Sequence, residues 1–527
     1  MQKSSGSYYT PDTLADFLIS KVAGHFKGKN GIRILEPSCG DGSFLKALSR
    51  SAFEGRSVIE AVELKTSTIK KAKAPQKTRS EVTFHNEDFL HFRSTKTYDL
   101  VIGNPPYIKR KLLKLRQKER CRQIHNVAGL LNRAISNIWT AFLIKSAQHL
   151  SSDGVLAFVL PAELLQVKFA QEIQSFLKRH FQRIEIYSFR EMAFDNLGQD
   201  TIALIAYRKA VEPGVYFGQV ANLALASKSD HLLTRSKSVE TSDIKWAGHI
   251  LSDDDADFLI GIASRLHPIS HYCNSCAGIV TAANKFFVVS KQIRKQFDLN
   301  AISKPIIQRG QFVNGTIVFD SVAFKKIKNE GKPCYLLDVT GKKLKNLSKG
   351  ARKYITSGRS EGIQERYKCE KRKRWYDVPS VWSSHAFFFK RCHLYPKLLL
   401  NDAKVLVTDA AYRISVKEGF CVRSLIFSFY NSLTLAMAEL RGRFYGGGVL
   451  EVTPNEFKSL PIPYVEIADT DFLEFEERFD RAESIEHTLQ TNDAIILKGC
   501  LDLNSDEIGM LQSIRKKLVS RRLRETA

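Results

Sequence analysis

The sequence has few of the features that mark a secreted or membrane protein. It contains no apolar run long enough to cross a bilayer, and its first residues, MQKSSGSYYT, lack the apolar stretch of a signal peptide. Nine cysteines among 527 residues are too sparse for a disulfide framework. We therefore expect a cytoplasmic protein with reduced thiols and no membrane partner.

Motifs for metal binding and for nucleophilic catalysis are also scarce. Cys273 and Cys276 have the spacing of metal ligands, but no second cysteine pair and no suitably spaced histidines accompany them. We find no convincing serine–histidine–acid arrangement and no nuclease cluster of carboxylates with a lysine. The sequence therefore predicts no metal site, and cleavage of a nucleic acid would belong to a separate protein.

Acidic residues are in deficit. The chain has 80 lysines and arginines against 55 aspartates and glutamates, which gives a formal net charge of +25. Such a surplus creates a long-range field that attracts polyanions, so nucleic acid is the first partner to consider. A generally basic surface, a ribosome-associated protein and a protein of anionic membranes are the alternatives, and charge does not distinguish DNA from RNA.

The first half of the chain has the pattern of an α/β domain. Short apolar runs alternate with amphipathic stretches of helical length, as in βαβ units. Runs such as LVIG and LAFVL are apolar on both faces, which is typical of central strands in a covered parallel sheet. The expected strands lie at residues 32–38, 57–64, 82–89, 98–107, 154–161, 183–189 and 201–209. We expect a doubly wound, Rossmann-like fold.

The second half has a different pattern of apolar residues, and we expect it to be α+β. Hairpin-like strands are predicted at 277–290 and 310–320, further strands at 397–416, one buried helix at 426–442 and terminal helices from about 471 to 524. The changes in pattern predict three parts, at residues 1–245, 246–465 and 466–527.

A glycine turn after the first strand indicates a ligand site. In ILEPSCGDGSFLKAL the strand runs into Gly40 and Gly42 and then into a helix, so a ligand can approach the backbone at the carboxyl edge of the sheet. Glu63 follows about twenty residues later, where an acid can bind ribose hydroxyls, and Asp88 ends the third strand. Glu36 would repel a pyrophosphate but suits the cation S-adenosylmethionine. Solvated carboxylates at strand ends are the alternative.

The segment VIGNPPY, residues 101–107, follows the fourth strand and opens onto the same crevice. An exocyclic purine amine is a poor nucleophile because its lone pair is delocalised into the ring. If the Asn104 side-chain oxygen and the Pro105 carbonyl oxygen each accept one of its hydrogens, they favour a pyramidal nitrogen directed at a sulfonium methyl. Tyr107 offers a face on which a base can stack. A plain proline turn is the alternative.

In this order, YYTPDTLADFLI, ILEPSCGDGSFLKAL, Glu63, NEDF and YDLVIGNPPY resemble the gamma-class DNA adenine-N6 methyltransferases of the TaqI type. The likeness is strong from residue 1 to about residue 210 and weaker in CAGIVTAANKFFVVS and FYGGGVLEVTPNEFKSLPIP. It implies a Rossmann-like S-adenosylmethionine-dependent methyltransferase domain followed by an α+β target-recognition domain. The implied cofactor-binding residues are Thr10, Glu36, Ser38, Gly40, Glu63 at the ribose and Asp88 at the adenine ring.

The resemblance also implies an activity. Such an adenine-specific DNA methyltransferase moves a methyl group from S-adenosylmethionine to N6 of an adenine flipped out of double-stranded DNA. Asn104, Pro105 and Tyr107 would form the catalytic turn, and Phe194 would pack on the flipped adenine unless it is a core residue. The implied role is protection of host DNA in a restriction–modification system, as a monomer on DNA beside a separately acting restriction endonuclease.

Two basic segments are candidates for DNA contact. KRKLLKLRQKERCR begins directly after the catalytic turn, where Lys109, Arg110 and Lys111 are predicted to bind phosphates beside an extruded base. RYKCEKRKRWYDVPS mixes cations with aromatic residues, as a groove-reading loop does. Its predicted DNA-binding residues are Arg372, Arg374 and Trp375. The alternatives are a solvated helix face for the first segment and buried aromatic residues in the second.

Rival functions stay open at this point. The NPPY sequence also serves enzymes that methylate glutamine side chains of release factors or N2 of guanine in ribosomal RNA. The long basic second half argues against the glutamine enzymes and less strongly against RNA. A third rival is a non-catalytic DNA-binding module that kept the fold, but the intact Asn104 and cofactor set argue against it.

Overall fold

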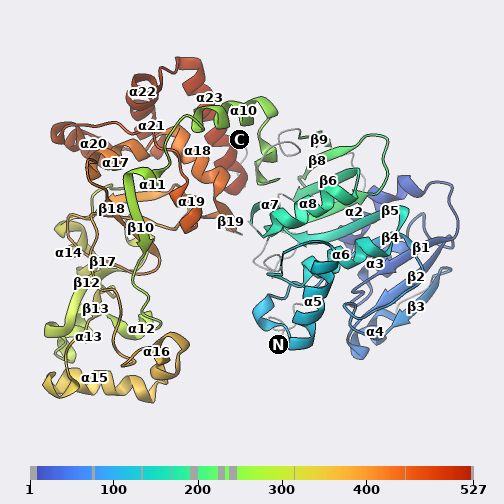
Figure 1. Ribbon diagram of the computed structural model, residues 1–527, viewed down its shortest axis with the longest axis horizontal. Helices are drawn as coiled ribbons and strands as arrows, with labels where there is room; N and C mark the ends of the chain where they lie inside the picture. The colour runs from blue at the N-terminus through green and yellow to red at the C-terminus, as the bar shows by residue number, and fades with distance from the viewer. Residues whose placement is uncertain are drawn as a thin grey trace. The chain divides into compact units, whose positions relative to one another are not determined.

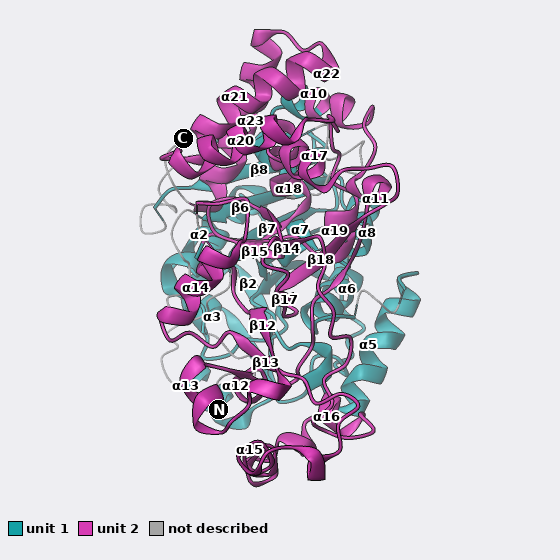
Figure 2. Ribbon diagram, turned by 90° about the vertical axis from the view of Figure 1, so that its left-hand side faces the viewer, with its two compact units in different colours: residues 1–256, 445–447 teal, residues 257–444, 448–527 magenta. Residues whose placement is uncertain are grey.

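The computed structural model divides the chain into two compact units (Figure 1, Figure 2). Unit 1 comprises Met1–Ala256 and Tyr445–Gly447, and unit 2 comprises Asp257–Phe444 and Gly448–Ala527. The structure describes residues 9–73, 78–131, 135–167, 169–189, 200–222, 232–236, 246–313, 315–445 and 447–523. The expected boundary at 245 falls shortly before the end of the main segment of unit 1, and the division at 465 stays a prediction. None of the described helices is both long and apolar enough to span a membrane.

Unit 1 is built around a sheet with the strand order β3-β2-β1-β4-β5-β7-β6-β8-β9. β1 pairs in parallel with β2 and with β4, and β3 and β5 extend the parallel part on either side. The strand order reverses at β1, which places a ligand crevice at the carboxyl ends of β1 and β4. The strands are β1 Ile32–Glu36, β2 Ser57–Val62, β3 Glu81–His85, β4 Tyr98–Gly103, β5 Leu150–Pro161, β6 Arg183–Phe189, β7 Thr201–Tyr207, β8 Gly214–Val220 and β9 Thr234–Arg235.

Helices cover the sheet of unit 1 (Figure 1). Ile34 and Leu100 pack with residues of α2 and α3 in one buried cluster. Leu35 and Val101, which alternate with them and point to the other face, are also fully buried. These central strands are apolar on both sides, so the α/β expectation for the first half is confirmed. The helices are α2 Asp12–Ala23, α3 Ser43–Ser49, α4 Thr66–Lys73, α5 Leu115–Val127, α6 Trp139–His149, α7 Glu163–Gln166 and α8 Ala170–His180.

The sheet of unit 1 is not parallel throughout. β7 lies between β5 and β6 and is antiparallel to both. β6 and β7 are consecutive, and only the residues between Phe189 and Thr201 join them. The sheet of unit 1 is therefore mixed, with an antiparallel strand beside its parallel part.

Unit 2 contains smaller sheets, with the orders β10-β18-β14-β16, β11-β13-β12-β17 and β15-β20-β19. Its strands are β10 Cys273–Ala277, β11 Val288–Val289, β12 Ser303–Ile307, β13 Tyr335–Leu337, β14 Ala386–Phe389, β15 Arg391–Cys392, β16 Lys397–Leu400, β17 Leu406–Val407, β18 Ala411–Val416, β19 Arg443–Tyr445 and β20 Val449–Glu451. The strands expected at 397–416 are confirmed as β16, β17 and β18. Separate helices and mixed sheets make this half α+β.

The hairpins expected at 277–290 and 310–320 are wrong. The helix α12, Asn284–Phe287, interrupts the first, because the Thr281 hydroxyl accepts from the Ala283 N–H at 3.1 Å and donates to the Asn284 side chain, which starts a helical turn. β11 then pairs with β13, far along the chain. In the second segment Gly310–Phe312 is a 3₁₀ turn. Partners distant in sequence override the local pattern here.

The buried helix expected at 426–442 is two helices. α17, Val422–Phe429, ends before Asn431, and α18, Ser432–Arg441, begins after it. The Asn431 side chain accepts from the Thr434 N–H at 2.9 Å, which is an N-cap contact. The remaining helices are α10 Asp253–Ala263, α11 Ile269–Tyr272, α13 Lys291–Gln296, α14 Ser321–Asn329, α15 Lys349–Ser360, α16 Tyr367–Glu370, α19 Pro454–Lys458, α20 Asp469–Arg481, α21 Ile485–Asp493, α22 Gly499–Leu501 and α23 Ser505–Leu523.

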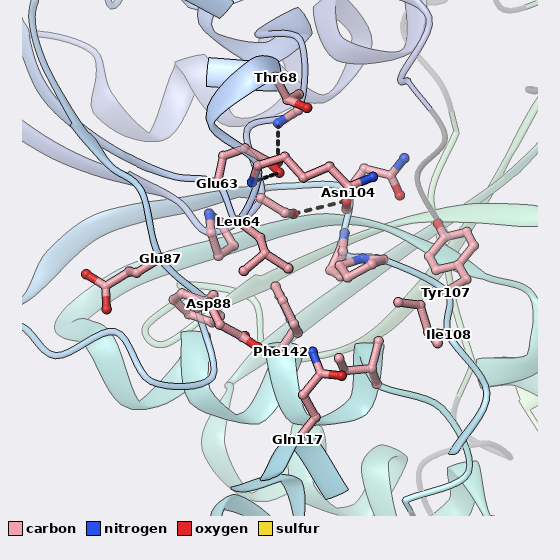
Figure 3. A pocket seen from close by; sticks show the side chains of 18 of the residues that line it. Glu63, Leu64, Thr68, Glu87, Asp88, Asn104, Tyr107, Ile108, Gln117 and Phe142 are labelled. Atoms are coloured by element: carbon pink, nitrogen blue, oxygen red, sulfur yellow. Dashed lines mark hydrogen bonds between the residues drawn. The ribbon is translucent and has the colours of Figure 1, made fainter. Parts of the chain in front are cut away.

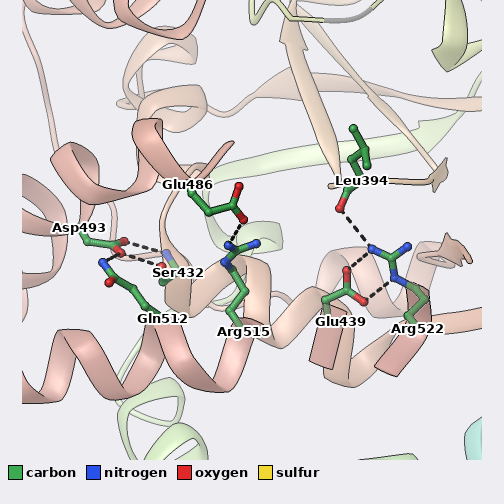
Figure 4. A network of polar contacts seen from close by, with 8 residues as sticks. All are labelled: Leu394, Ser432, Glu439, Glu486, Asp493, Gln512, Arg515 and Arg522. Atoms are coloured by element: carbon green, nitrogen blue, oxygen red, sulfur yellow. Dashed lines mark hydrogen bonds and ion pairs between the residues drawn. The ribbon is translucent and has the colours of Figure 1, made fainter. Parts of the chain in front are cut away.

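Buried polar contacts hold the terminal helices to the rest of unit 2 (Figure 4). Arg522 of α23 forms a two-point ion pair with Glu439 of α18, at 2.7 and 2.8 Å, and both side chains are almost fully buried. Asp493 accepts from the backbone N–H and the hydroxyl of Ser432, at 2.8 and 2.6 Å. A buried charge such as Arg522 or Glu439 is tolerated when it is paired. The ion pair therefore holds α23 to α18, and the Asp493 contacts hold α21 to α18.

Candidate active site

A cavity opens at the edge of the unit 1 sheet where β1, β2 and β4 end (Figure 3). It contains about 920 Å³ of empty space including its open mouth. Its walls combine the carboxylates Glu63, Glu87 and Asp88 with apolar side chains such as Leu64 and Phe142. Of the residues predicted for cofactor binding or catalysis, the cavity is lined by Ser38, Gly40, Glu63, Asp88, Asn104, Pro105 and Tyr107.

The glycine turn and Glu63 form one side of the cavity. Gly40 and Gly42 have φ angles of +54° and +88°, in the left-handed region that favours glycine. The Gly40 N–H donates to one carboxylate oxygen of Glu63 at 3.2 Å, and the Lys65 N–H donates to the other at 2.9 Å. Backbone groups therefore orient the Glu63 carboxylate at the end of β2, the position at which Rossmann-like folds bind ribose hydroxyls.

Asp88 follows β3 and is held from two directions. Its Oδ1 accepts from the Leu90 N–H at 3.0 Å, and its Oδ2 accepts from the side-chain amide of Gln117, on α5, at 3.0 Å. Gln117 itself lines the cavity. Sequence reasoning missed Gln117 because it lies within a segment that was interpreted only as basic, and no local spacing signals its contact with the end of β3.

A buried lysine supports the turn that carries Asp88. Lys145 of α6 is 4% exposed, and its Nζ donates to the carbonyl oxygens of Phe89 and Phe92, each at 2.6 Å. Burial, aided by the nearby Arg120, lowers the pKa of Lys145 to about 8. Its sequence context, FLIKSAQH, reads as an ordinary buried helix, so this residue also gave no functional signal.

Three hydrogen bonds fix the Asn104 turn. The Asn104 side-chain nitrogen donates to the Thr10 hydroxyl at 3.1 Å, and the Asn104 carbonyl oxygen accepts from the Ser38 hydroxyl at 3.1 Å. The Tyr107 hydroxyl donates to the Val159 carbonyl on β5 at 3.1 Å. Because the amide nitrogen faces Thr10, the amide oxygen of Asn104 faces away from it. The glycine turn and the Asn104 turn are thereby joined in one structure.

Thr10 and Glu36, both predicted to line the cofactor pocket, are buried directly beside residues that line the cavity. They are 8% and 1% exposed. Burial, with repulsion from Asp41 and Glu63, raises the pKa of Glu36 well above its ordinary value, and among the described residues its Oε2 has no hydrogen-bond partner. Glu36 directly precedes the cavity-lining segment, so a cationic ligand there would stabilise its ionised form. S-adenosylmethionine fits this requirement.

The two aromatic residues predicted at the target base differ in what the structure describes. Tyr107 lines the cavity, and burial raises the pKa of its hydroxyl well above the ordinary value. The hydroxyl therefore stays protonated and keeps its hydrogen bond to β5. Phe194 lies outside the described residues.

The first basic segment is exposed beside the cavity. Lys109, Arg110 and Lys111 follow the Asn104 turn, and Arg110–Leu112 forms a 3₁₀ turn ahead of α5. All three cations are exposed, and with Lys118 they line a shallow hollow. This arrangement suits phosphate contact, and the contact itself stays a prediction.

The arginines of the second basic segment have partners within unit 2. The Arg372 guanidinium donates to the carbonyl oxygens of Val280 and Thr281, at 3.1 and 2.9 Å. Arg374 forms a two-point ion pair with Asp377, at 2.7 and 2.9 Å. These contacts stabilise the loop around residue 281 and the turn after residue 374, so they favour an internal role for both arginines.

Trp375 is packed against the apolar core of unit 2. Its ring centroid lies 5.7 Å from that of Phe286, and the ring belongs to the shell around the buried cluster. The exposed cations of this segment are instead Arg366 and its lysines, among them Lys371 and Lys373. The predicted DNA contact of Arg372, Arg374 and Trp375 stays a prediction, and the structure favours the alternative of buried aromatic residues.

Two protein families match this chain. The family described as type II methyltransferase M.Eco57I, C-terminal domain, matches residues 243–497. The Eco57I restriction-modification methylase family matches residues 44–194. The second match contains Glu63, Asp88 and the Asn104 turn, and the first covers most of unit 2.

The chain is also similar to individual restriction–modification proteins. The chain is 24% identical to the type II methyltransferase M.AccI of Acinetobacter calcoaceticus over 479 residues, which cover 86% of this chain and 84% of M.AccI. It is 31% identical over 180 residues to the modification methylase CviBIII of Paramecium bursaria Chlorella virus NC1A, covering 33% of this chain and 43% of CviBIII. The type IIL restriction-modification enzyme MmeI, solved in complex with DNA, aligns over 97% of this chain and 76% of its own at 14% identity, with a TM-score of 0.58, and shares the fold.

The cavity and the matches agree on one identity. A glycine turn with oriented carboxylates suits S-adenosylmethionine, and the family matches span both units. The chain is similar to the Eco57I modification methylases in both units, and is a DNA methyltransferase of restriction–modification with S-adenosylmethionine as its cofactor.

Proposed function

We propose that this DNA methyltransferase is adenine-specific and acts on N6 of an adenine flipped out of duplex DNA at one short sequence. The observation that supports this most is that Asn104 and Pro105 line the same cavity as Glu63 and Asp88, and that Ser38 bonds the two turns together. When bound, the cofactor supplies a methyl group on a positively charged sulfur. The acceptors of the Asn104 turn would then lie in the same cavity as the methyl donor.

Asn104 and Pro105 act on the target amine in this proposal. The Asn104 side-chain oxygen and the Pro105 carbonyl oxygen each accept one amine hydrogen, which directs the nitrogen lone pair toward the methyl group and stabilises the developing positive charge. Thr10 is a positioning residue, since it holds the amide nitrogen and so sets the direction of the oxygen. The nitrogen–carbon bond would form as the methyl–sulfur bond breaks, and the charged amine would then lose one proton to water, so neither acceptor has to remove a proton before the transfer.

The cofactor is held by the carboxylates in this proposal. Glu63, already oriented by two backbone N–H groups, accepts from the ribose hydroxyls, and Asp88 accepts from the adenine amine. Glu36 ionises in response to the cationic end of the cofactor. Gly40 lets the ligand approach the backbone.

The target base stacks on aromatic side chains, worth about 1–3 kcal/mol per base. Tyr107, fixed through its hydroxyl to Val159, provides one face, and Phe194 provides the other. Lys109, Arg110 and Lys111 bind phosphates beside the extruded base. The stacking on the aromatic side chains partly offsets the free-energy cost of removing the base from the duplex.

The wider role follows from the type II systems named for the relatives. We propose that the enzyme works in the cytoplasm, binds DNA as a monomer and protects its sites from a restriction endonuclease that is a separate protein. A restriction assay tests this role: DNA methylated by the enzyme should resist one endonuclease of the same host and no other.

The reaction is tested by incubating the purified protein with S-adenosylmethionine labelled in the methyl group, in parallel with unmethylated genomic DNA, ribosomal RNA and total protein. We expect label in DNA alone, recovered after nucleoside digestion as N6-methyladenine. Label in RNA or protein, or in a DNA base other than adenine, would overturn the proposal.

A further inference from the structure

The outer surface of α15 carries a row of cations. Lys349, Arg352, Lys353 and Arg359 are all exposed, and we call them the α15 face. They recur at intervals of three, four and ten residues from Lys349, which places them on one side of a helix. The opposite side buries Ala351, Ile355 and Gly358. Figure 1 and Figure 2 show α15 at the end of unit 2 remote from α21 and α22.

Two glycines fix which side of α15 faces outward. A Cβ at Gly350 would lie 2.4 Å from the Phe297 carbonyl oxygen, and a Cβ at Gly358 would lie 2.5 Å from the Trp375 ring. A glycine inside a helix costs about 1 kcal/mol relative to alanine, so close contact with the body of unit 2 accounts for both. The Tyr354 hydroxyl adds a hydrogen bond to the Phe286 carbonyl at 2.9 Å. These contacts hold one side of α15 against the body of unit 2, so the α15 face points to solvent.

The α15 face is a local concentration of positive charge, with Glu361 at the C-cap as the acidic residue next to the helix. Among the described residues, none of its four cations has an acidic side chain within ion-pair distance, in contrast to Arg374 with Asp377. The helix contains no aspartate or glutamate. Like charges three and four residues apart repel by a few tenths of a kcal/mol each, and cations in the first turn oppose the helix dipole. The arrangement costs stability unless an anion binds.

We propose that the α15 face binds the sugar–phosphate backbone of duplex DNA without reading bases. Lys349 to Arg359 spans about 15 Å along the helix axis, equal to the axial rise of four to five base pairs. Exposed lysines and arginines on a rigid helix suit phosphate contact, which sets the position of the protein on DNA but carries no sequence information. This inference rests on the proposed function for its partner, and adds the surface that supplies non-specific affinity.

The test compares two variants that lose the same charge. The first carries K349Q, R352Q, K353Q and R359Q. The control carries K325Q, K326Q, K498Q and K516Q, which are exposed lysines of unit 2 outside α15. Affinity is measured by fluorescence anisotropy between 50 and 200 mM salt, on one duplex that contains the methylated motif and on one that lacks it. Cofactor affinity is measured in parallel, and should be unchanged in both variants.

We expect the α15 variant to bind both duplexes about 10²-fold more weakly at low salt, with the slope of log affinity against log salt reduced by about 3–4, since each phosphate contact contributes about 0.9. The ratio between the two duplexes should stay the same. The single variants R352Q and K353Q should each reduce the slope by about 0.9, which keeps the test valid if the fourfold variant misfolds.

Two results would overturn the inference. An α15 variant that binds DNA as the control does would show that the face makes no contact, and a collapse of the ratio between the duplexes would show that it reads bases. Failure of the proposed function looks different, because the wild-type protein would then label no adenine in DNA whatever the state of α15.

Discussion

The cavity of unit 1 and the α15 face of unit 2 use charge in opposite ways. In the cavity two carboxylates are oriented before a ligand arrives, Glu63 by two backbone N–H groups and Asp88 by Leu90 and Gln117. On α15 the cations lie in solvent. Oriented groups select a ligand by geometry, whereas exposed cations attract any polyanion. Changes in the first region should therefore have large, discrete effects, and changes in the second should have graded effects that depend on salt.

Arg522 extends this comparison, because it is a cation fully buried inside the protein whereas the cations of α15 are exposed. Replacing it by methionine, in R522M, should lower the free energy of unfolding by about 3–5 kcal/mol, because Glu439 would be left as a buried charge without its partner. The measurement is urea denaturation followed by circular dichroism. The double variant R522M/E439L should lose less than R522M alone, and an equal or larger loss would contradict this account of the pair.

Asn104 tests the cavity itself. N104A should lower the rate of methyl transfer by about 10²–10³-fold, the usual effect of removing one oriented group at a reacting centre, while the dissociation constant of S-adenosylmethionine changes little. Transfer is measured by methyl labelling of DNA and binding by isothermal titration calorimetry. The exposed Asn455 provides the control, N455A, which should change neither. Joint loss of binding and transfer in N104A would indicate that the turn is only structural.

His125 tests the contact between α5, which carries Gln117, and α6. Its ring bonds the Cys121 carbonyl at 2.7 Å and the Thr140 hydroxyl at 3.0 Å, and burial lowers the pKa of His125 from 6.5 to about 4. Between these values the unfolded chain binds a proton that the folded chain does not, so stability present above pH 6.5 is lost as the pH falls. The loss approaches about 3 kcal/mol near pH 4.

The measurement is the difference in unfolding free energy between pH 7 and pH 4.5 in the wild type and in H125Q. H125Q cannot take up the proton at this position, so we expect its stability to fall less over the same range. An identical fall in the two proteins would show that His125 does not contribute to the acid sensitivity.

Arg372 and Lys373 allow the same comparison, between a cation with internal partners and an exposed cation, at two adjacent residues. R372Q should lower the free energy of unfolding by about 1–3 kcal/mol, because the carbonyls of Val280 and Thr281 lose a charged donor. K373Q should leave stability unchanged and weaken DNA binding a few-fold at low salt, as expected for one phosphate contact. Denaturation and anisotropy separate the two effects, and a loss of DNA binding in R372Q at full stability would restore Arg372 as a DNA-binding residue.

The sequence was most informative where topology alone places a side chain. Glu63, Asp88 and Asn104 each follow a strand of a parallel sheet, and the carboxyl ends of such strands meet at one edge. Their convergence on one cavity could therefore be predicted from strand order and spacing. The buried strands around them could also be predicted, because they are apolar on both faces.

The sequence was least informative where a contact joins distant segments. Gln117 and Lys145 reach the Asp88 turn from α5 and α6, and neither has a local signal. The hairpins expected in unit 2 fail because β11 pairs with β13 across more than forty residues of chain. The charge of Arg372 is visible in the sequence, but its carbonyl partners are not. Charge alone cannot separate an internal contact from a DNA contact.

The central claim, methylation of adenine N6 at one duplex sequence, is tested most directly by single-molecule sequencing of DNA from cells that express this chain in a background without other methyltransferases. We predict N6-methyladenine at a single recurring motif with the wild type, and unmodified DNA with N104A. Modification of cytosine, or no modified DNA base while the protein labels RNA or protein, would contradict the account.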